Sequence, residues 1–117
     1  MRIATSLIIV FGLLGLLTSC AQMAPHPMDM SQAIQKATTR SDHEALAKHY
    51  EDTAKEMQSK AEEHKKMLEK YESNTSHYGR QALDLQAHCR NLIHSYEQAA
   101  KGNMDMASSH RAMAAEK

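Results

Sequence analysis

The stretch SDHEALAKHYEDTAKEMQSKAEEHKKMLEKYE, residues 41–72, decides the fold of this protein. It contains no glycine or proline and is rich in alanine, glutamate and lysine, which favour one long α-helix. Starting at His43 and moving along the stretch by four and three residues in turn gives a series of positions, none of which is acidic, lysine or arginine. This spacing is typical of the contact seam of a coiled coil. The predicted seam contains His43, Ala47, Tyr50, Ala54, Met57, Ala61, His64, Leu68 and Tyr71.

A second helix of the same kind follows. Ser41 and Glu44 predict the start of the first helix, because a capping box of this type satisfies two backbone N–H groups. The cluster at 73–76, Ser-Asn-Thr-Ser, predicts a turn, since these side chains hydrogen-bond their own backbone. The second helix is expected from about Tyr78 to Ala115. Its predicted seam contains Tyr78, Ala82, Leu85, Cys89, Leu92, Tyr96, Ala99, Asn103, Met106, His110 and Met113.

Two such helices predict an all-α fold, a long antiparallel helical hairpin that resembles a coiled coil. Each helix would be about 45–55 Å long at ~1.5 Å per residue. A hairpin alone leaves part of this broad apolar stripe exposed. We therefore expect two hairpins to associate into a four-helix bundle, or one hairpin to dock on a helical partner.

The N-terminus has the features of a secretory signal. Arg2 precedes an apolar run that is shorter than the ~20 residues of a membrane span, and Leu17-Thr18-Ser19-Cys20 follows the run. These four residues resemble the lipobox of bacterial lipoproteins. The resemblance implies cleavage before Cys20, lipidation of Cys20 and a stable acyl anchor in the membrane. Ala21 lacks the acidic character that often retains lipoproteins in the inner membrane of enteric bacteria, which favours the outer membrane on its periplasmic side.

These signals divide the chain into a signal peptide (1–19), the lipidated cysteine with a flexible tether (20–40, in which 29–37 can form a short helix) and the hairpin domain (41–117). No family motif is identified in the hairpin domain. With 14 basic and 14 acidic residues over the full chain, no basic surface for nucleic acid is expected. Cys89 would be the sole free thiol in an oxidising compartment, either buried, metal-bound or paired with another chain.

Facing residues suggest metal ligands. With the turn near residue 75, residues whose numbers sum to about 151 would face each other. His43 would then lie beside His110 and Met106, with Met113 or Met104 close by. Imidazole and thioether ligands together suit Cu(I). His64, Cys89 and His88 would form a second group for Cu(I) or Zn(II). In the tether, a loose Met/His segment resembles those of periplasmic copper proteins and contains Met23, His26, Met28 and Met30.

Simpler interpretations of these side chains stay open. Methionine at helical spacing usually fills a core, and a lone cysteine on a seam usually acts as a small hydrophobe. A histidine on a seam is usually a half-buried polar residue that bonds a neighbour. No oxyanion donors or phosphate loop accompany the hairpin, so the protein is not expected to be an enzyme. Two functions remain: a membrane-anchored, non-catalytic helical interaction module, or a lipoprotein that sequesters or transfers copper or another soft metal.

Overall fold

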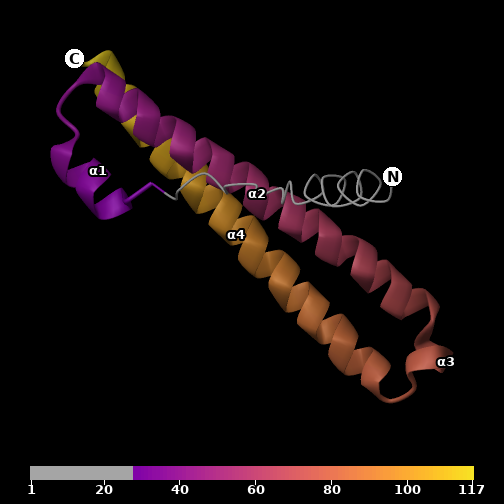
Figure 1. The fold of residues 1–117 in the computed structure, drawn as a ribbon. Coiled ribbons are helices and arrows are strands. Elements are labelled where there is room, and N and C mark those ends of the chain that lie inside the picture. The colour runs from indigo at the N-terminus through magenta and orange to yellow at the C-terminus, as the bar shows by residue number, and fades with distance from the viewer. Residues whose placement is uncertain (1–27) are drawn as a thin grey trace, which may run out of the picture.

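The computed structural model of the protein describes residues 28–117. It contains four helices: α1 (Met30–Lys36), α2 (Arg40–Ser73), α3 (Thr75–Tyr78) and α4 (Gln81–Ala115). Helices α2 and α4 pack side by side and antiparallel, which confirms the predicted helical hairpin (Figure 1). The predicted signal peptide, Cys20 and the tether residues Met23 and His26 lie outside the described residues.

Local hydrogen bonds set where α1 and α2 begin. Asp29 caps α1 by accepting a hydrogen bond from the backbone N–H of Gln32, 3.1 Å away. The predicted Ser41/Glu44 capping box of α2 is wrong, because Thr39 and Asp42 form the box instead. The Thr39 hydroxyl accepts from the Asp42 N–H at 3.2 Å, and the Asp42 carboxylate accepts from the Thr39 N–H at 2.9 Å. Both side chains of this box are shorter than Glu44, and they start the helix one residue before Ser41.

The reversal between the long helices lies later than the sequence predicts. Helix α2 ends at Ser73, but the chain then forms the short α3 before Gly79 turns it back. Gly79 has a φ of 57°, the left-handed region that glycine enters without steric penalty. Three ion pairs that bridge the hairpin therefore join residues whose numbers sum to 162, not to the expected 151: Glu51–Arg111, Lys65–Glu97 and Glu72–Arg90.

The seam of α2 is largely as predicted. On α4, Ala82, Cys89 and His110 are buried as predicted, but the alternate seam positions are shifted by one residue. The predicted α4 seam residues Leu92, Met106 and Met113 keep 39%, 42% and 43% of their surface exposed. Their next neighbours, Ile93, Ala107 and Ala114, face α2 in their place. The buried residues of α4 are Ala82, Gln86, Cys89, Ala100, Ala107, His110 and Ala114.

Alanine explains this rotation. On α2, three alanines spaced by seven residues (47, 54 and 61) are at most 2% exposed. On α4, three more alanines with the same spacing (100, 107 and 114) are at most 4% exposed. The distance between packed helices depends on the side chains at the contact, so alanine on both sides lets the backbones approach closely. The larger leucine and methionine side chains then lie at the edge of the contact.

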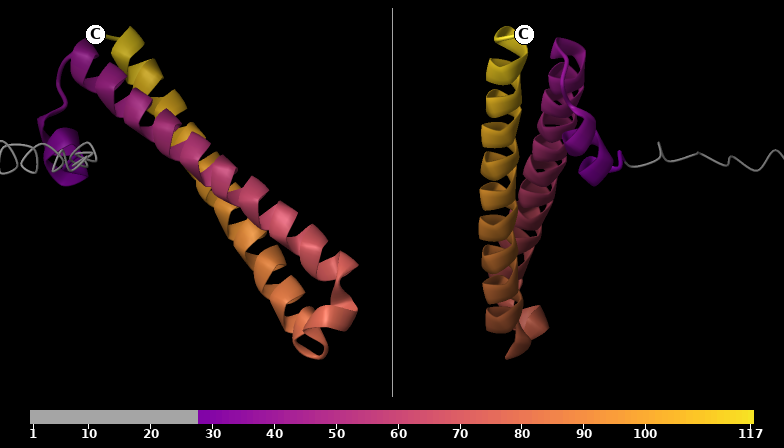
Figure 2. Two further views of the ribbon diagram at one scale, coloured as in Figure 1. Left: turned by 45° about the vertical axis from the view of Figure 1, so that its right-hand side comes forward. Right: turned by 90° about the vertical axis from the view of Figure 1, so that its left-hand side faces the viewer.

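Two further views show α2 and α4 side by side (Figure 2). The two edges along which these helices meet differ in chemistry. We call the edge with Glu51–Arg111, Lys65–Glu97 and Glu72–Arg90 the ion-pair edge. The opposite edge carries ring contacts between α2 and α4, namely those of His43, Tyr50 and His64 with His110 and Tyr96, and we call it the aromatic edge. Within residues 28–117, no ion pair bridges the two long helices on the aromatic edge.

Candidate functional site

His43 and His110 meet where the open end of the hairpin brings the start of α2 to the end of α4. Their Nδ1 atoms are 3.1 Å apart, although the residues are 67 positions apart in sequence. The side chains are buried, with 8% and 6% of the surface of His43 and His110 exposed. The sequence correctly paired these two residues. It did so despite the wrong register, because both lie on the seam within one helical turn of each other.

Tyr50 covers the other side of His110. The His110 ring stacks on His43 at a centroid distance of 5.4 Å and on Tyr50 at 5.6 Å. Tyr50 follows His43 by seven residues, so both project from the same edge of α2. The result is a stack of three rings with His110 in the middle. Its position between two rings restricts the rotation of the His110 imidazole.

The environment of His110 disfavours its protonated form. Burial lowers the pKa of His110 below its ordinary value of 6.5, and the adjacent His43 lowers this pKa further. A neutral imidazole carries one N–H and one free lone pair. Within the 3.1 Å contact, one Nδ1–H therefore donates to the other Nδ1. In this contact the accepting Nδ1 uses its lone pair, and the donating ring must move its proton from Nδ1 to Nε2 before its own Nδ1 can bind a metal ion.

The predicted methionine ligands differ in position. Met106 precedes His110 by four residues and Met113 follows it by three, so both lie one turn away on the same side of α4. Both are partly exposed. Met104 instead lines a shallow pocket on the ion-pair edge with Gln58 and Lys101. Met106 and Met113 therefore lie within one helical turn of His110 along α4, whereas Met104 lines the pocket on the ion-pair edge.

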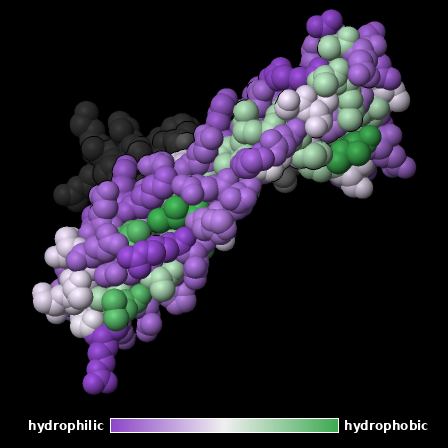
Figure 3. All heavy atoms as spheres, turned by 180° about the vertical axis from the view of Figure 1, so that it is seen from behind, coloured by the Kyte–Doolittle hydropathy of each residue, from purple (hydrophilic) through white to green (hydrophobic). Residues whose placement is uncertain are grey.

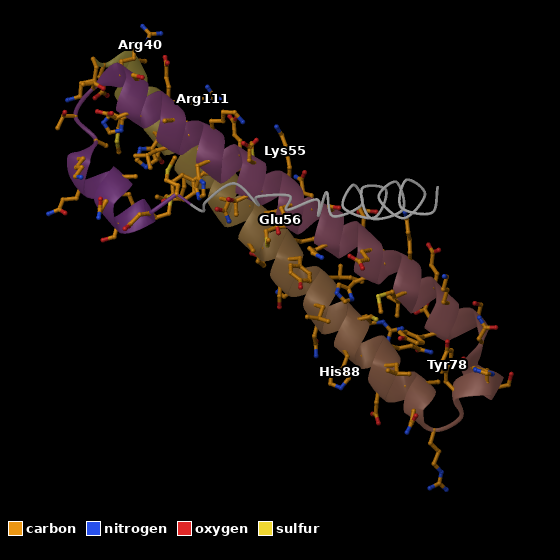
Figure 4. All side chains as sticks on the ribbon, in the orientation of Figure 1. Arg40, Lys55, Glu56, Tyr78, His88 and Arg111 are labelled. Carbon is orange, nitrogen blue, oxygen red and sulfur yellow. The ribbon has the colours of Figure 1, made fainter. Side chains whose placement is uncertain are left out.

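The second predicted group is not assembled. His64 stacks on Tyr96 with a centroid distance of 5.6 Å, and its buried Nδ1 has no hydrogen-bond partner. His88 is exposed and projects from the outer side of α4 (Figure 4). Cys89 is buried, and burial raises the pKa of its thiol, which opposes the thiolate form that binds metals. The sequence left three states open for Cys89: buried, metal-bound or paired with another chain. The structure shows Cys89 as a buried free thiol.

The rest of the described chain offers no larger cluster of metal ligands. Nowhere in residues 28–117 do three or more His, Cys, Asp or Glu side chains converge as metal ligands. No helix in the same residues is both long and apolar enough to cross a membrane.

Among known proteins, no family model matches the sequence, and neither a curated protein nor a solved structure matches it.

Sequence reasoning missed the ion-pair edge, although a signal for it is present. Glu51, Lys65 and Glu72 fall on one row of α2 at multiples of seven residues. Their partners Arg90, Glu97 and Arg111 fall on one row of α4 with the same spacing. Matching these rows by opposite charge gives the correct register at once, because only one alignment pairs all three.

Proposed function

We propose that the protein is a membrane-tethered, non-catalytic module that binds another helical surface through the outer side of α4. The lipobox at residues 17–20 supports anchoring through Cys20 on the periplasmic side of the envelope, with the outer membrane favoured. The observation that carries the proposal is the outer surface of α4. Only six of the 35 residues of α4 are charged, and a row of leucine and methionine along this helix is exposed to solvent.

This row defines the docking surface. It consists of residues spaced by seven on the aromatic edge: Leu85, Leu92, Ala99, Met106 and Met113. The residues that border it on the solvent side are exposed and carry no acidic or basic group other than histidine: His88, Ser95, Gly102 and Ser109. Figure 3, a view from the side opposite to Figure 1, shows hydrophobic patches between hydrophilic side chains along the length of the hairpin. A docking partner must therefore offer an equally uncharged helix.

A second copy of α4 meets this requirement. Around Ala99 the row is self-complementary, because Leu92 and Met106 lie seven residues on either side of it. Leu85 and Met113 lie fourteen residues on either side. If two α4 helices cross antiparallel at Ala99, each leucine meets a methionine and the smallest side chain lies at the two-fold axis. Such self-complementarity is what a symmetric dimer interface requires, and it yields a four-helix bundle.

Sedimentation equilibrium of the full chain in density-matched detergent tests this proposal. We expect a dimer, and we expect Leu92→Asp to weaken it by about a hundredfold or more, because a buried unpaired carboxylate is strongly unfavourable. The control is Leu83→Asp, the same change on the same helix at a position that is 69% exposed and outside the row. A monomeric wild type, or a dimer that both variants retain with unchanged helicity, would overturn the proposal.

Soft-metal binding is a second candidate function, and one observation favours it. The two histidines that the sequence suggested as copper ligands meet at 3.1 Å in a buried position. Sequestration or transfer of copper at the membrane surface would be compatible with the anchor and needs no catalysis.

A further inference from the structure

We propose that His43 and His110, with the thioethers of Met106 and Met113, form a site for a single Cu(I) ion at the open end of the hairpin. The inference rests on the second candidate function, soft-metal binding, and deepens it by naming the ion and its ligands. Four observations carry it: the distance between the imidazoles, their burial, the places of the methionines, and the ligand types that are absent nearby.

The distance between the imidazoles fits a bound metal ion. With metal–nitrogen bonds of ~2.0–2.1 Å, two nitrogens of a tetrahedral site lie about 3.3 Å apart. The Nδ1 atoms of His43 and His110 lie 3.1 Å apart, so small ring movements suffice. The ion takes the place of the proton between the two nitrogens. The ring that donates this proton changes tautomer and carries it on Nε2, so two neutral imidazoles bind the ion without net loss of a proton.

The remaining ligands come from one side of α4. His43 approaches His110 from the aromatic edge, and Met106 and Met113 lie on that same edge, one turn before and one turn after His110. Arg111, the neighbour of His110, points the other way and bonds Glu51 on the ion-pair edge (Figure 4). The flexible, partly exposed thioethers can therefore turn toward the histidine pair without displacing a charged group.

The choice of ion follows from the available donors. Zinc sites are built from thiolate, imidazole and carboxylate ligands, usually four of them. Within residues 28–117, no third side chain of those types joins the histidine pair. Thioethers are soft ligands that select Cu(I) over zinc and over hard ions. Two imidazoles and two thioethers thus favour Cu(I).

A Cu(I) competition titration of the full chain, kept reduced in detergent against a chromogenic Cu(I) chelator, tests the site. We expect one equivalent to bind, the double variant His43→Ala/His110→Ala to lose this binding, and Met106→Leu/Met113→Leu to bind at least about tenfold more weakly. His88→Ala/His94→Ala is the matched control, since both of these histidines are exposed on α4. Circular dichroism checks that each variant is helical.

The outcomes separate the site from the function. Copper that binds wild type and the His43/His110 variant equally would refute this site but leave a copper function at other residues. No Cu(I) binding by wild type would refute both. Unchanged affinity in the methionine variant, or Zn(II) that competes as well as Cu(I), would overturn the ligand set even if the histidine variant does not fold.

Discussion

Helices α2 and α4 are nearly equal in length and share one seam, yet they show opposite surfaces to their surroundings. Of the 34 residues of α2, sixteen are acidic, lysine or arginine, whereas α4 has six among 35. Three of those six bond α2 across the ion-pair edge, and two more, Lys101 and Asp105, pair with each other. The outer side of α4 is thus almost free of net charge.

The two long helices therefore differ in the chemistry of the surface that each exposes. Helix α2 exposes most of its charged side chains to solvent, because charged side chains are costly to bury. Helix α4 exposes leucine and methionine that a solvent-facing helix does not need. We interpret α2 as the solvent helix and α4 as the contact helix, and substitutions in both helices test this interpretation.

The largest effect on the free energy of unfolding is expected at a buried leucine of α2, since α4 buries no leucine. Leu46 is 1% exposed and is the largest fully buried side chain of the described residues. Leu46→Ala should lower the free energy of unfolding by about 2–5 kcal/mol, through lost burial and the cavity left behind. Leu83→Ala, at an exposed position of α4, should change it by less than about 0.5 kcal/mol. Urea unfolding measures both, and similar losses would contradict the assignment of the core.

The next effect concerns the seam, where the helices are alike. Ala54 and Ala107 are 0% and 1% exposed on α2 and α4. Leucine at either position forces the backbones apart and should cost about 1–3 kcal/mol. The matched controls are Ala45→Leu on α2 and Ala112→Leu on α4, both at exposed positions. Thermal unfolding followed by circular dichroism makes the comparison, and a seam variant as stable as its control would show that the alanines do not set the helix spacing.

A smaller effect is expected from pH. The pKa of folded His110 lies below its ordinary value of 6.5, chiefly through burial and then through His43. As the pH falls below about 6.5, the unfolded chain takes up this proton first, so stability decreases until the folded pKa is passed. His110→Leu should flatten this decrease, whereas His94→Leu, at an exposed position, should leave it unchanged. Urea unfolding between pH 7.5 and 5 gives the slopes, and parallel slopes for all three proteins would refute the prediction.

The smallest effect belongs to the ion-pair edge. Arg111 donates from Nε to Glu51 at 2.7 Å, but the Arg111 side chain is 55% exposed. Pairs of this kind contribute about 0.2–1 kcal/mol and weaken with salt. Arg111→Gln should therefore lower stability within that range at low salt and by less at 1 M salt. Arg40→Gln, whose partner Glu44 lies on the same helix, is the comparison. A loss well above 1 kcal/mol would mean that the edge, not the alanine seam, holds the hairpin.

The sequence predicted the elements that depend on periodicity. Two glycine-poor segments with seven-residue repeats suffice for an antiparallel hairpin, and the seam positions of His43 and His110 suffice to pair them. The start of α2 was missed because Thr39 and Asp42 compete with Ser41 and Glu44 by equally plausible local hydrogen bonds. The turn was missed because α3 depends on a few backbone bonds and on the φ of Gly79, which leave no periodic signal.

The rotation of α4 had a different origin. Leucine and methionine are more hydrophobic than alanine. A prediction based on hydrophobicity alone therefore places Leu92 and Met106 on the seam. Close approach of the helices favours the smaller Ala100 and Ala107 instead. The early placement of the turn, and not this rotation, paired His64 with Cys89, whereas the true register brings His64 to Tyr96. The pairing of His43 with His110 was nevertheless predicted correctly, because His110 lies on both the predicted and the observed seam of α4.

The start of α2 and the end of α4 lie at one end of the hairpin, and α3 lies at the other end. Helix α1 contacts α2, and the chain enters α2 at the end where α4 finishes (Figure 1). A helix of 34 residues is about 50 Å long. If Cys20 holds the chain to a lipid surface, His43 and His110 lie at the height where the rod begins, while Tyr71 and Tyr78 at the reversal can reach roughly 50 Å into the space beyond it. One short protein would then sample two depths of the envelope at once.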